Sequence, residues 1–133
     1  MLTATDRAGH ALGVTEMDDT HRTFVGYLDA LAKASEADFP GLFHQLLGHT
    51  RKHFERETQL MHECSFPAIA EHGAEHARVL ADLTHLAIRV QQGNLVMART
   101  YVSGLPDWFR HHLATMDSAL AARLKAHATH QVP

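Results

Sequence analysis

The sequence has little of what marks a secreted, membrane-bound or nucleic-acid-binding protein. Cys64 is its only cysteine, so no disulfide can form within the chain, as is usual in a reducing cytoplasm. No apolar run approaches the roughly 20 residues of a membrane helix, and the first residues lack the basic-then-apolar pattern of a signal peptide. The formal net charge is −3, and no basic run offers an electrostatic surface to nucleic acid. We therefore expect a cytoplasmic protein with no membrane or nucleic-acid partner.

Residues that interrupt helices are also scarce. The main breakers are Pro40, Pro67, Gly93 and Pro106, and the segments between them are rich in alanine, leucine, glutamate, arginine and histidine, which favour helix. The chain has 133 residues, of which 45% are apolar and 20% charged, as is typical of one soluble globular domain. The prediction is a single all-α domain over residues 1–133.

These breakers divide the chain into four expected helices, at about 18–36, 40–64, 67–93 and 94–128. Ser65 is the expected N-cap of the third helix. Pro106 should kink the fourth, because it removes one hydrogen bond and clashes with the preceding turn. Residues 1–17 should form an extended arm. Because short connections place successive helices antiparallel, we expect an up-down-up-down four-helix bundle.

The most unusual feature of the composition is its 13 histidines, which are scattered along the chain. Several polar residues lie on helical stripes that are otherwise apolar, namely His21, His53, Glu57, His72, His76 and His112. Burying a polar group costs free energy unless the group is paired. One such histidine could simply bond a backbone carbonyl. Six polar residues converging from four helices are better explained by a metal that supplies the missing partner.

The spacing within each helix supports a shared site. His53 and Glu57 are four residues apart, as are His72 and His76, so each pair stacks on one helix face. A lone pair of this kind is weak support, because exposed pairs occur in any histidine-rich helix. Two pairs on neighbouring helices, joined by histidines from the other two helices, make a much stronger signal.

Asp117 fits this pattern less simply. It follows His112 by five residues, which places it about 140° away on an ideal helix. Helical geometry alone therefore leaves open whether the carboxylate points inward. A local widening of the helix into a π-type turn would bring it round to the histidine face, and such turns favour functional sites.

At this point the residues resemble the hemerythrin family in its bacterial form. The resemblance runs from about residue 12 to residue 124 and rests on four segments, MDDTHRTFVGYL, HFERETQLM, SFPAIAEHGAEH and WFRHHLATMD. In these segments the family's metal-ligand positions are filled, in order, by His21, His53, Glu57, His72, His76, His112 and Asp117. Two other positions depart from the family pattern. Thr58 stands where a second carboxylate is usual, and His49 where an aromatic residue is common, so the role of His49 stays open.

This resemblance implies a non-haem di-iron centre inside the bundle. It assigns one iron to His72, His76 and His112, the other to His21 and His53, and the bridge to Glu57 and Asp117 with a solvent-derived oxo or hydroxo group. The second iron then keeps one open coordination position, where dioxygen can bind reversibly. Candidates for the apolar wall around that position are Phe24, Leu60, Met61, Trp108 and Leu113.

The ligand types also bear on the kind of chemistry. Oxidase-type di-iron bundles use about four carboxylates and two Glu-x-x-His motifs, and this sequence has no Glu-x-x-His. Fewer anionic ligands stabilise high oxidation states less, which favours a non-enzymatic oxygen carrier, store or supplier. The alternatives are an oxygen or redox sensor, and peroxide or nitric oxide chemistry at the same centre. A zinc site is disfavoured because zinc prefers four ligands.

Overall fold

The computed structural model describes residues 11–131. Over this range all the regular elements are helices, and there is no strand. Its elements in chain order are α2 (Thr15–Lys33), α3 (Phe39–Glu63), α4 (Ile69–Gln91), α5 (Val96–His112), the π-helical turn η1 (Leu113–Asp117) and α6 (Ser118–Gln131).

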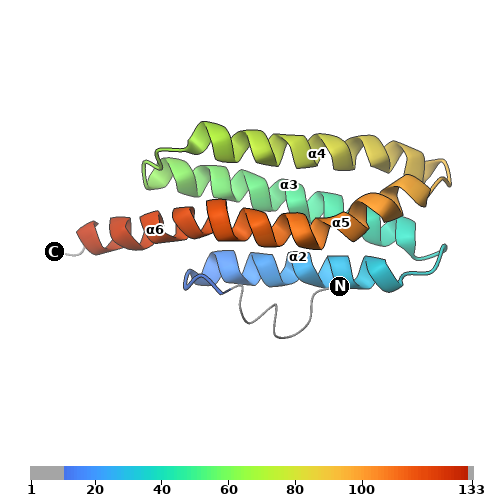
Figure 1. Ribbon diagram of the computed structural model, residues 1–133, viewed down its shortest axis with the longest axis horizontal. Helices are drawn as coiled ribbons and strands as arrows, with labels where there is room; N and C mark the ends of the chain where they lie inside the picture. Colours follow the sequence, from blue (N-terminus) through green and yellow to red (C-terminus); the bar gives the residue numbers. More distant parts are fainter. Residues whose placement is uncertain (1–10, 132–133) are drawn as a thin grey trace.

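The helices form the expected antiparallel bundle. The last three elements make one continuous rod, which lies beside the three rods α2, α3 and α4 (Figure 1). Successive rods run in opposite directions, and packing contacts join α2 to α3, α3 to α4, α4 to α5 and α5 back to α2. Pro106 lies inside α5, whose first turns run obliquely in Figure 1 before the ribbon straightens toward η1. Within residues 11–131 no helix is long and apolar enough to cross a bilayer.

The first helix begins earlier than the sequence indicated. We expected it near residue 18, but α2 begins at Thr15, and residues 11–14 precede it without regular structure. The carboxylate of Asp18 accepts the backbone N–H groups of Leu12 at 2.8 Å and Gly13 at 3.1 Å, which ties these residues to the first turn. Residues 15–17, which we expected in an extended arm, therefore belong to α2, and residues 1–10 of that expected arm lie outside the described part.

The connection from α3 to α4 corrects the role expected of Ser65. Its backbone is left-handed, with φ of 52°, and α4 begins instead after Ala68, which makes no side-chain capping bond. The N–H of Ser65 reaches the carbonyl of His62, and that of Phe66 reaches Met61, which is the hydrogen-bond pattern of a Schellman motif. Ser65 therefore ends α3 rather than starting α4. The next connection closes in the same way around Gly93, whose φ is 83°.

The apolar core is divided into two clusters along the bundle. The larger includes Phe24, Phe54 and Phe109, and the smaller includes Met17 and Leu120. On α2, α3 and the last rod, buried polar side chains stand between the residues of the two clusters. We use the name polar layer for the buried histidines and carboxylates of this region, including those of α4, namely His21, His53, Glu57, His72, His76, His112 and Asp117.

Candidate metal centre

The polar layer contains every ligand candidate from the sequence, and all of them are buried, with exposed fractions between 1% and 7%. Its members come from all four rods and are His21, His53, Glu57, His72, His76, His112 and Asp117. Helical spacing places the α3 pair and the α4 pair, because residues four apart share a face. The structure thus brings together the whole predicted set.

Asp117 reaches this layer through the π-type turn that the sequence left open. Residues 113–117 form η1, directly after His112. A turn with more residues than an α-helical turn places a residue five positions on close to the same face. Asp117 is 1% exposed, and its Oδ1 lies 3.3 Å from His112 Nε2. Helical spacing alone left open whether the Asp117 carboxylate points into the bundle, and the structure shows that it does.

The Glu57 carboxylate divides its two oxygens between two groups of histidines. Oε1 lies 3.1 Å from Nε2 of His72 and 3.4 Å from Nε2 of His76. Oε2 lies 2.7 Å from Nε2 of His53 and 3.5 Å from Nε2 of His21. One carboxylate therefore serves both groups, with one oxygen turned toward each.

Asp117 repeats this division on the other side. Its Oδ1 lies 3.1 Å from Nε2 of His72 and 3.3 Å from that of His112, whereas its Oδ2 lies 3.2 Å from Nε2 of His21. The ligand atoms gather accordingly into two clusters. One has Glu57, His72, His76, His112 and Asp117, and the other has His21, His53 and Glu57.

These separations fit octahedral metal ions. Two ligand atoms bound at right angles, each about 2.1 Å from one ion, lie about 3.0 Å apart. Nε2 of His76 and Nε2 of His112 lie 3.2 Å apart, a contact in which at most one of the two neutral rings can donate. Several polar atoms of the layer have no hydrogen-bond partner among the described residues, including Nε2 of His72, Oε1 of Glu57 and Oδ1 of Asp117. Metal binding would satisfy these groups, so the donor set suits two hard or borderline cations.

The charges of the metal-free layer balance one another. Burial opposes ionisation of His21, but the carboxylates of Asp117 and Glu57 outweigh it and raise the pKa of His21 to about 9. The same carboxylates overcome burial at His72 and raise its pKa to about 9. For Glu57, burial and the Asp117 charge are outweighed by the facing nitrogens of His21, His53 and His72, which lower its pKa.

Asp117 and His76 complete the balance of charges in the layer. Burial likewise opposes ionisation of Asp117, but the facing nitrogens of His112, His21 and His72 hold its pKa well below the ordinary value. His76 differs, because burial lowers its pKa to about 3 with help from the neighbouring histidines. At neutral pH, two protonated histidines therefore face two carboxylates, and His76 is neutral.

Apolar side chains cover one side of the layer. A small hollow there is lined by Phe24, His53, Phe54, Trp108, Phe109, His112 and Asp117. The ring of Phe54 stacks on that of His76 at 3.7 Å, and the edge of Phe109 meets His21 at 5.3 Å. We did not single out Phe54 and Phe109 for this wall, although each lies within three positions of a ligand on its own helix.

The five residues expected around an open metal position are only partly at this hollow. Phe24 and Trp108 line it, and Leu113 belongs to the same apolar cluster without lining it. Leu60 and Met61 pack instead in the smaller cluster. On α3 the hollow lies one turn before Glu57, whereas Leu60 and Met61 follow Glu57, so the polar layer separates them from it.

His49 lies beside the layer without joining either cluster. Its ring is 5.8 Å from that of His53 and 5.6 Å from that of Tyr27, and the residue is half-buried. Burial and the neighbouring His53 lower its pKa, whereas a backbone hydrogen bond at Thr20 opposes that shift. The ring of His49 therefore contacts that of His53, but His49 belongs to neither cluster of ligand atoms.

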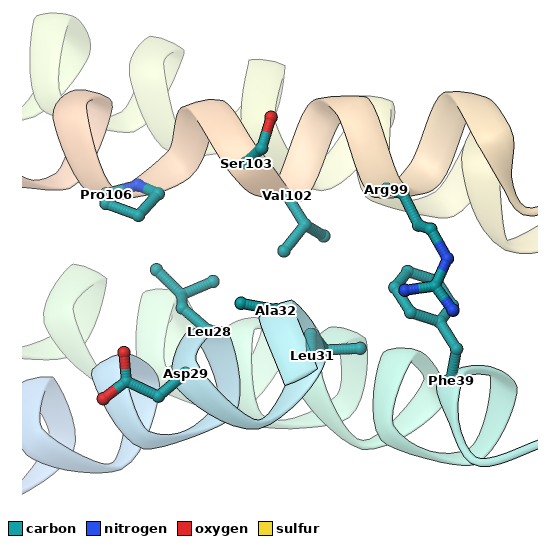
Figure 2. A pocket seen from close by; sticks show the side chains of 9 residues that line it. All are labelled: Leu28, Asp29, Leu31, Ala32, Phe39, Arg99, Val102, Ser103 and Pro106. Atoms are coloured by element: carbon teal, nitrogen blue, oxygen red, sulfur yellow. The ribbon is translucent and has the colours of Figure 1, made fainter. Parts of the chain in front are cut away.

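A separate cavity of about 250 Å³ lies between α2 and α5, away from the polar layer (Figure 2). Leu28 and Val102 point into it, and the guanidinium of Arg99 closes one end, 4.5 Å above the ring of Phe39. Arg99 also donates a hydrogen bond to the carbonyl of Ala34 at 3.1 Å. Among the described residues its lining has one carboxylate, Asp29, and no histidine or cysteine, so it lacks the cluster of histidines found in the layer.

Comparisons with known proteins agree with this geometry. Residues 12–124 match the model of the hemerythrin HHE cation binding domain. The chain is 35% identical over 113 residues to a bacteriohemerythrin of Ralstonia nicotianae, covering 85% of this chain and 82% of that protein. It is 27% identical over 122 residues to one of Stenotrophomonas maltophilia, covering 87% and 78%. A crystal structure of wild-type hemerythrin superposes with a TM-score of 0.78 at 20% identity, covering 93% of this chain and 96% of that one.

Proposed function

The chain belongs to the hemerythrin family, and from this premise we propose that it holds two iron ions in the polar layer and binds dioxygen there reversibly. The observation that carries the proposal is the division of carboxylate oxygens. Glu57 and Asp117 each turn one oxygen toward His72 and the other toward His21. Two carboxylates placed in this way suit a pair of ions rather than one.

These contacts support an assignment of the seven residues to two ions. His72, His76 and His112 would hold one iron, His21 and His53 the other, and the two carboxylates would bridge them. One iron then has fewer protein ligands than its partner. When bound, such a pair supplies an open coordination position and two electrons that dioxygen can accept and return.

The protein's own contribution is to orient the ligands and to exclude water. Phe54 fixes the plane of His76 by stacking, and Phe109 supports the ring of His21. The hollow beside His53 is lined largely by aromatic side chains, which offer few polar groups to water or protons. Limited access of water favours release of the bound gas as dioxygen over irreversible oxidation of the centre.

We place the protein among binding proteins rather than enzymes. Five neutral histidines and two carboxylates give the pair less negative charge than a site with four carboxylates, which favours reversible binding. A carrier, store or local supplier of oxygen is the corresponding role, and the unpaired, buried Cys64 fits a cytoplasmic location. Sensing, and peroxide or nitric oxide chemistry, are the outcomes that the experiment below separates from this one.

The test is a visible spectrum of iron-quantified protein, reduced without air, then exposed to air and returned to argon. Two irons per chain and a band that appears in air and fades under argon would support the proposal. His53→Gln, at a ligand position, should lower the iron content and abolish the band. His62→Gln, at an exposed histidine of the same helix, should change neither. Direct conversion to a stable oxidised spectrum would refute reversible binding.

A further inference from the structure

The five histidines of the polar layer each have a buried Nδ1 atom that lacks a hydrogen-bond partner among the described residues. Their Nε2 atoms face the carboxylates, and their Nδ1 atoms are buried without a hydrogen-bond partner among the described residues in His21, His53, His72, His76 and His112. A histidine that binds a metal through Nε2 carries its proton on Nδ1, and that proton needs an acceptor that also fixes the ring. The structure offers a carboxylate to one of these five rings.

That ring belongs to His112. Oε1 of Glu75 lies 3.9 Å from His112 Nδ1, and within residues 11–131 no other polar-layer Nδ1 has a carboxylate this near. The separation is about 1 Å longer than a hydrogen bond. The Glu75 side chain is 25% exposed, and closing the gap requires a shift of about 1 Å in a carboxylate that also lies 3.9 Å from the Arg78 guanidinium.

The same oxygen is already held in place by a second group. Trp108 donates its indole N–H to Glu75 Oε1 at 2.6 Å. The indole ring also stacks on the ring of His112, with centroids 4.7 Å apart and planes inclined by 18°. Trp108 therefore supports the histidine ring from one side and anchors, through its N–H, the carboxylate that faces Nδ1.

We infer that Glu75 is a positioning residue for the metal centre, whose carboxylate accepts the Nδ1 proton of His112 while Trp108 holds that carboxylate. This inference rests on the proposed function, because it needs His112 to bind a metal through Nε2. On α4, Glu75 lies three residues after His72 and directly before His76. It thus links α4 to α5 beside the ligands of one iron.

An acceptor of this kind orients the ring and makes its Nε2 a stronger donor. Removing such partners typically weakens metal binding by about 10- to 100-fold. Glu75→Ala should therefore speed the release of ferrous iron to a chelator by about that factor. Glu75→Gln keeps an acceptor oxygen but loses the charge, so its effect should be smaller.

The decisive readout is the solvent-exchangeable imidazole N–H signal of His112 in the proton NMR spectrum of the ferrous protein. The signal is assigned by its nuclear Overhauser contacts with the indole protons of Trp108, whose ring stacks on that of His112. It should shift in Glu75→Ala and, less strongly, in Trp108→Phe, which keeps a ring over His112 but has no N–H. Glu71→Gln is the matched control, because Glu71 is exposed one turn earlier on α4.

The outcomes separate this inference from the proposed function. If the unaltered protein takes up no iron, the proposed function itself fails. If it takes up two irons but Glu75→Ala matches Glu71→Gln in iron release and in the His112 signal, the inference is overturned. Faster release with an unmoved signal overturns it as well, because Glu75 would then act only on helix packing. Glu75→Gln, nearly the same size, repeats the test if the alanine variant does not fold.

Discussion

Binding of metal to the polar layer should displace protons, and the structure says from which side chains. His21 and His72 have pKa values raised to about 9 by the carboxylates they face, so at pH 7.5 each is roughly 97% protonated. A metal ion can bind only the unprotonated ring. Loading the layer must therefore expel about two protons from these two residues. Below pH 9 the apparent association constant should fall about 100-fold for each pH unit.

The number of protons is measurable by calorimetry. Anaerobic titration with ferrous iron is repeated in buffers of different ionisation enthalpy, and the slope of the observed enthalpy gives the protons released. His72→Gln removes one proton that must leave, whereas His76→Gln removes none, because His76 has a pKa near 3 and is already neutral. The release by His72→Gln should be about one proton smaller than that by His76→Gln.

This comparison is insensitive to protons from other sources. Any proton lost by a solvent-derived bridge contributes equally to both variants and cancels in the difference. Both variants lose one ligand to the same ion, so weaker binding affects them alike. Equal proton release by the two variants would refute the reasoning, since it would mean that His72 carries no proton in the metal-free protein.

Three further predictions follow from other parts of the structure. Ser65→Gly should raise the free energy of unfolding in urea by about 1 kcal/mol, because glycine adopts the left-handed backbone without strain. Gly93→Ala should lower the free energy of unfolding for the same reason. Urea midpoints identical to that of the unaltered protein would contradict both expectations. The raised pKa values of His21 and His72 add stability to the metal-free protein that is complete below pH 6.5 and lost as the pH rises through about 9. Its melting temperature should therefore fall between pH 7 and 10 while that of the metal-loaded protein holds, and a flat metal-free profile would count against the shifts. Trp108→Ala should speed autoxidation several-fold, measured as decay of the band formed in air, and an unchanged decay rate would remove Trp108 from the hollow's protective wall.

Helical periodicity was sufficient to predict the bundle and the ligand faces. Residues such as His53 and Glu57 share a face because of a spacing that is visible in the sequence and insensitive to the rest of the fold. Asp117 shows where this reasoning stops. Its position depends on a π-type turn, and that turn depends on packing and on contacts from three histidines rather than on local propensity.

The remaining differences have equally physical causes. Ser65 is a good helix N-cap by type, but the hydrogen bonds that close α3 require a residue at that point with positive φ. Leu60 and Met61 lie on the inward stripe, and a stripe identifies burial without showing on which side of the polar layer a residue lies. Glu75 is partly exposed beside His76, so its type and position alone did not single it out. The role that we infer for it depends on a hydrogen bond from Trp108, which lies 33 positions away in the chain.

The polar layer also affects how cooperatively the bundle unfolds. Cooperative unfolding needs apolar contacts that continue through the core, and here the layer interrupts them between the two clusters. In the proposed metal-loaded protein, coordination bonds from all four rods would join the two clusters into one unit. Without metal, the links across the layer are its facing charges and Leu12, which packs against both clusters. We therefore expect the smaller cluster to open at a lower free energy when no metal is bound. Cys64 is fully buried in that cluster. We therefore expect Cys64, the only thiol of the chain, to react more slowly with solvent reagents when the layer holds metal.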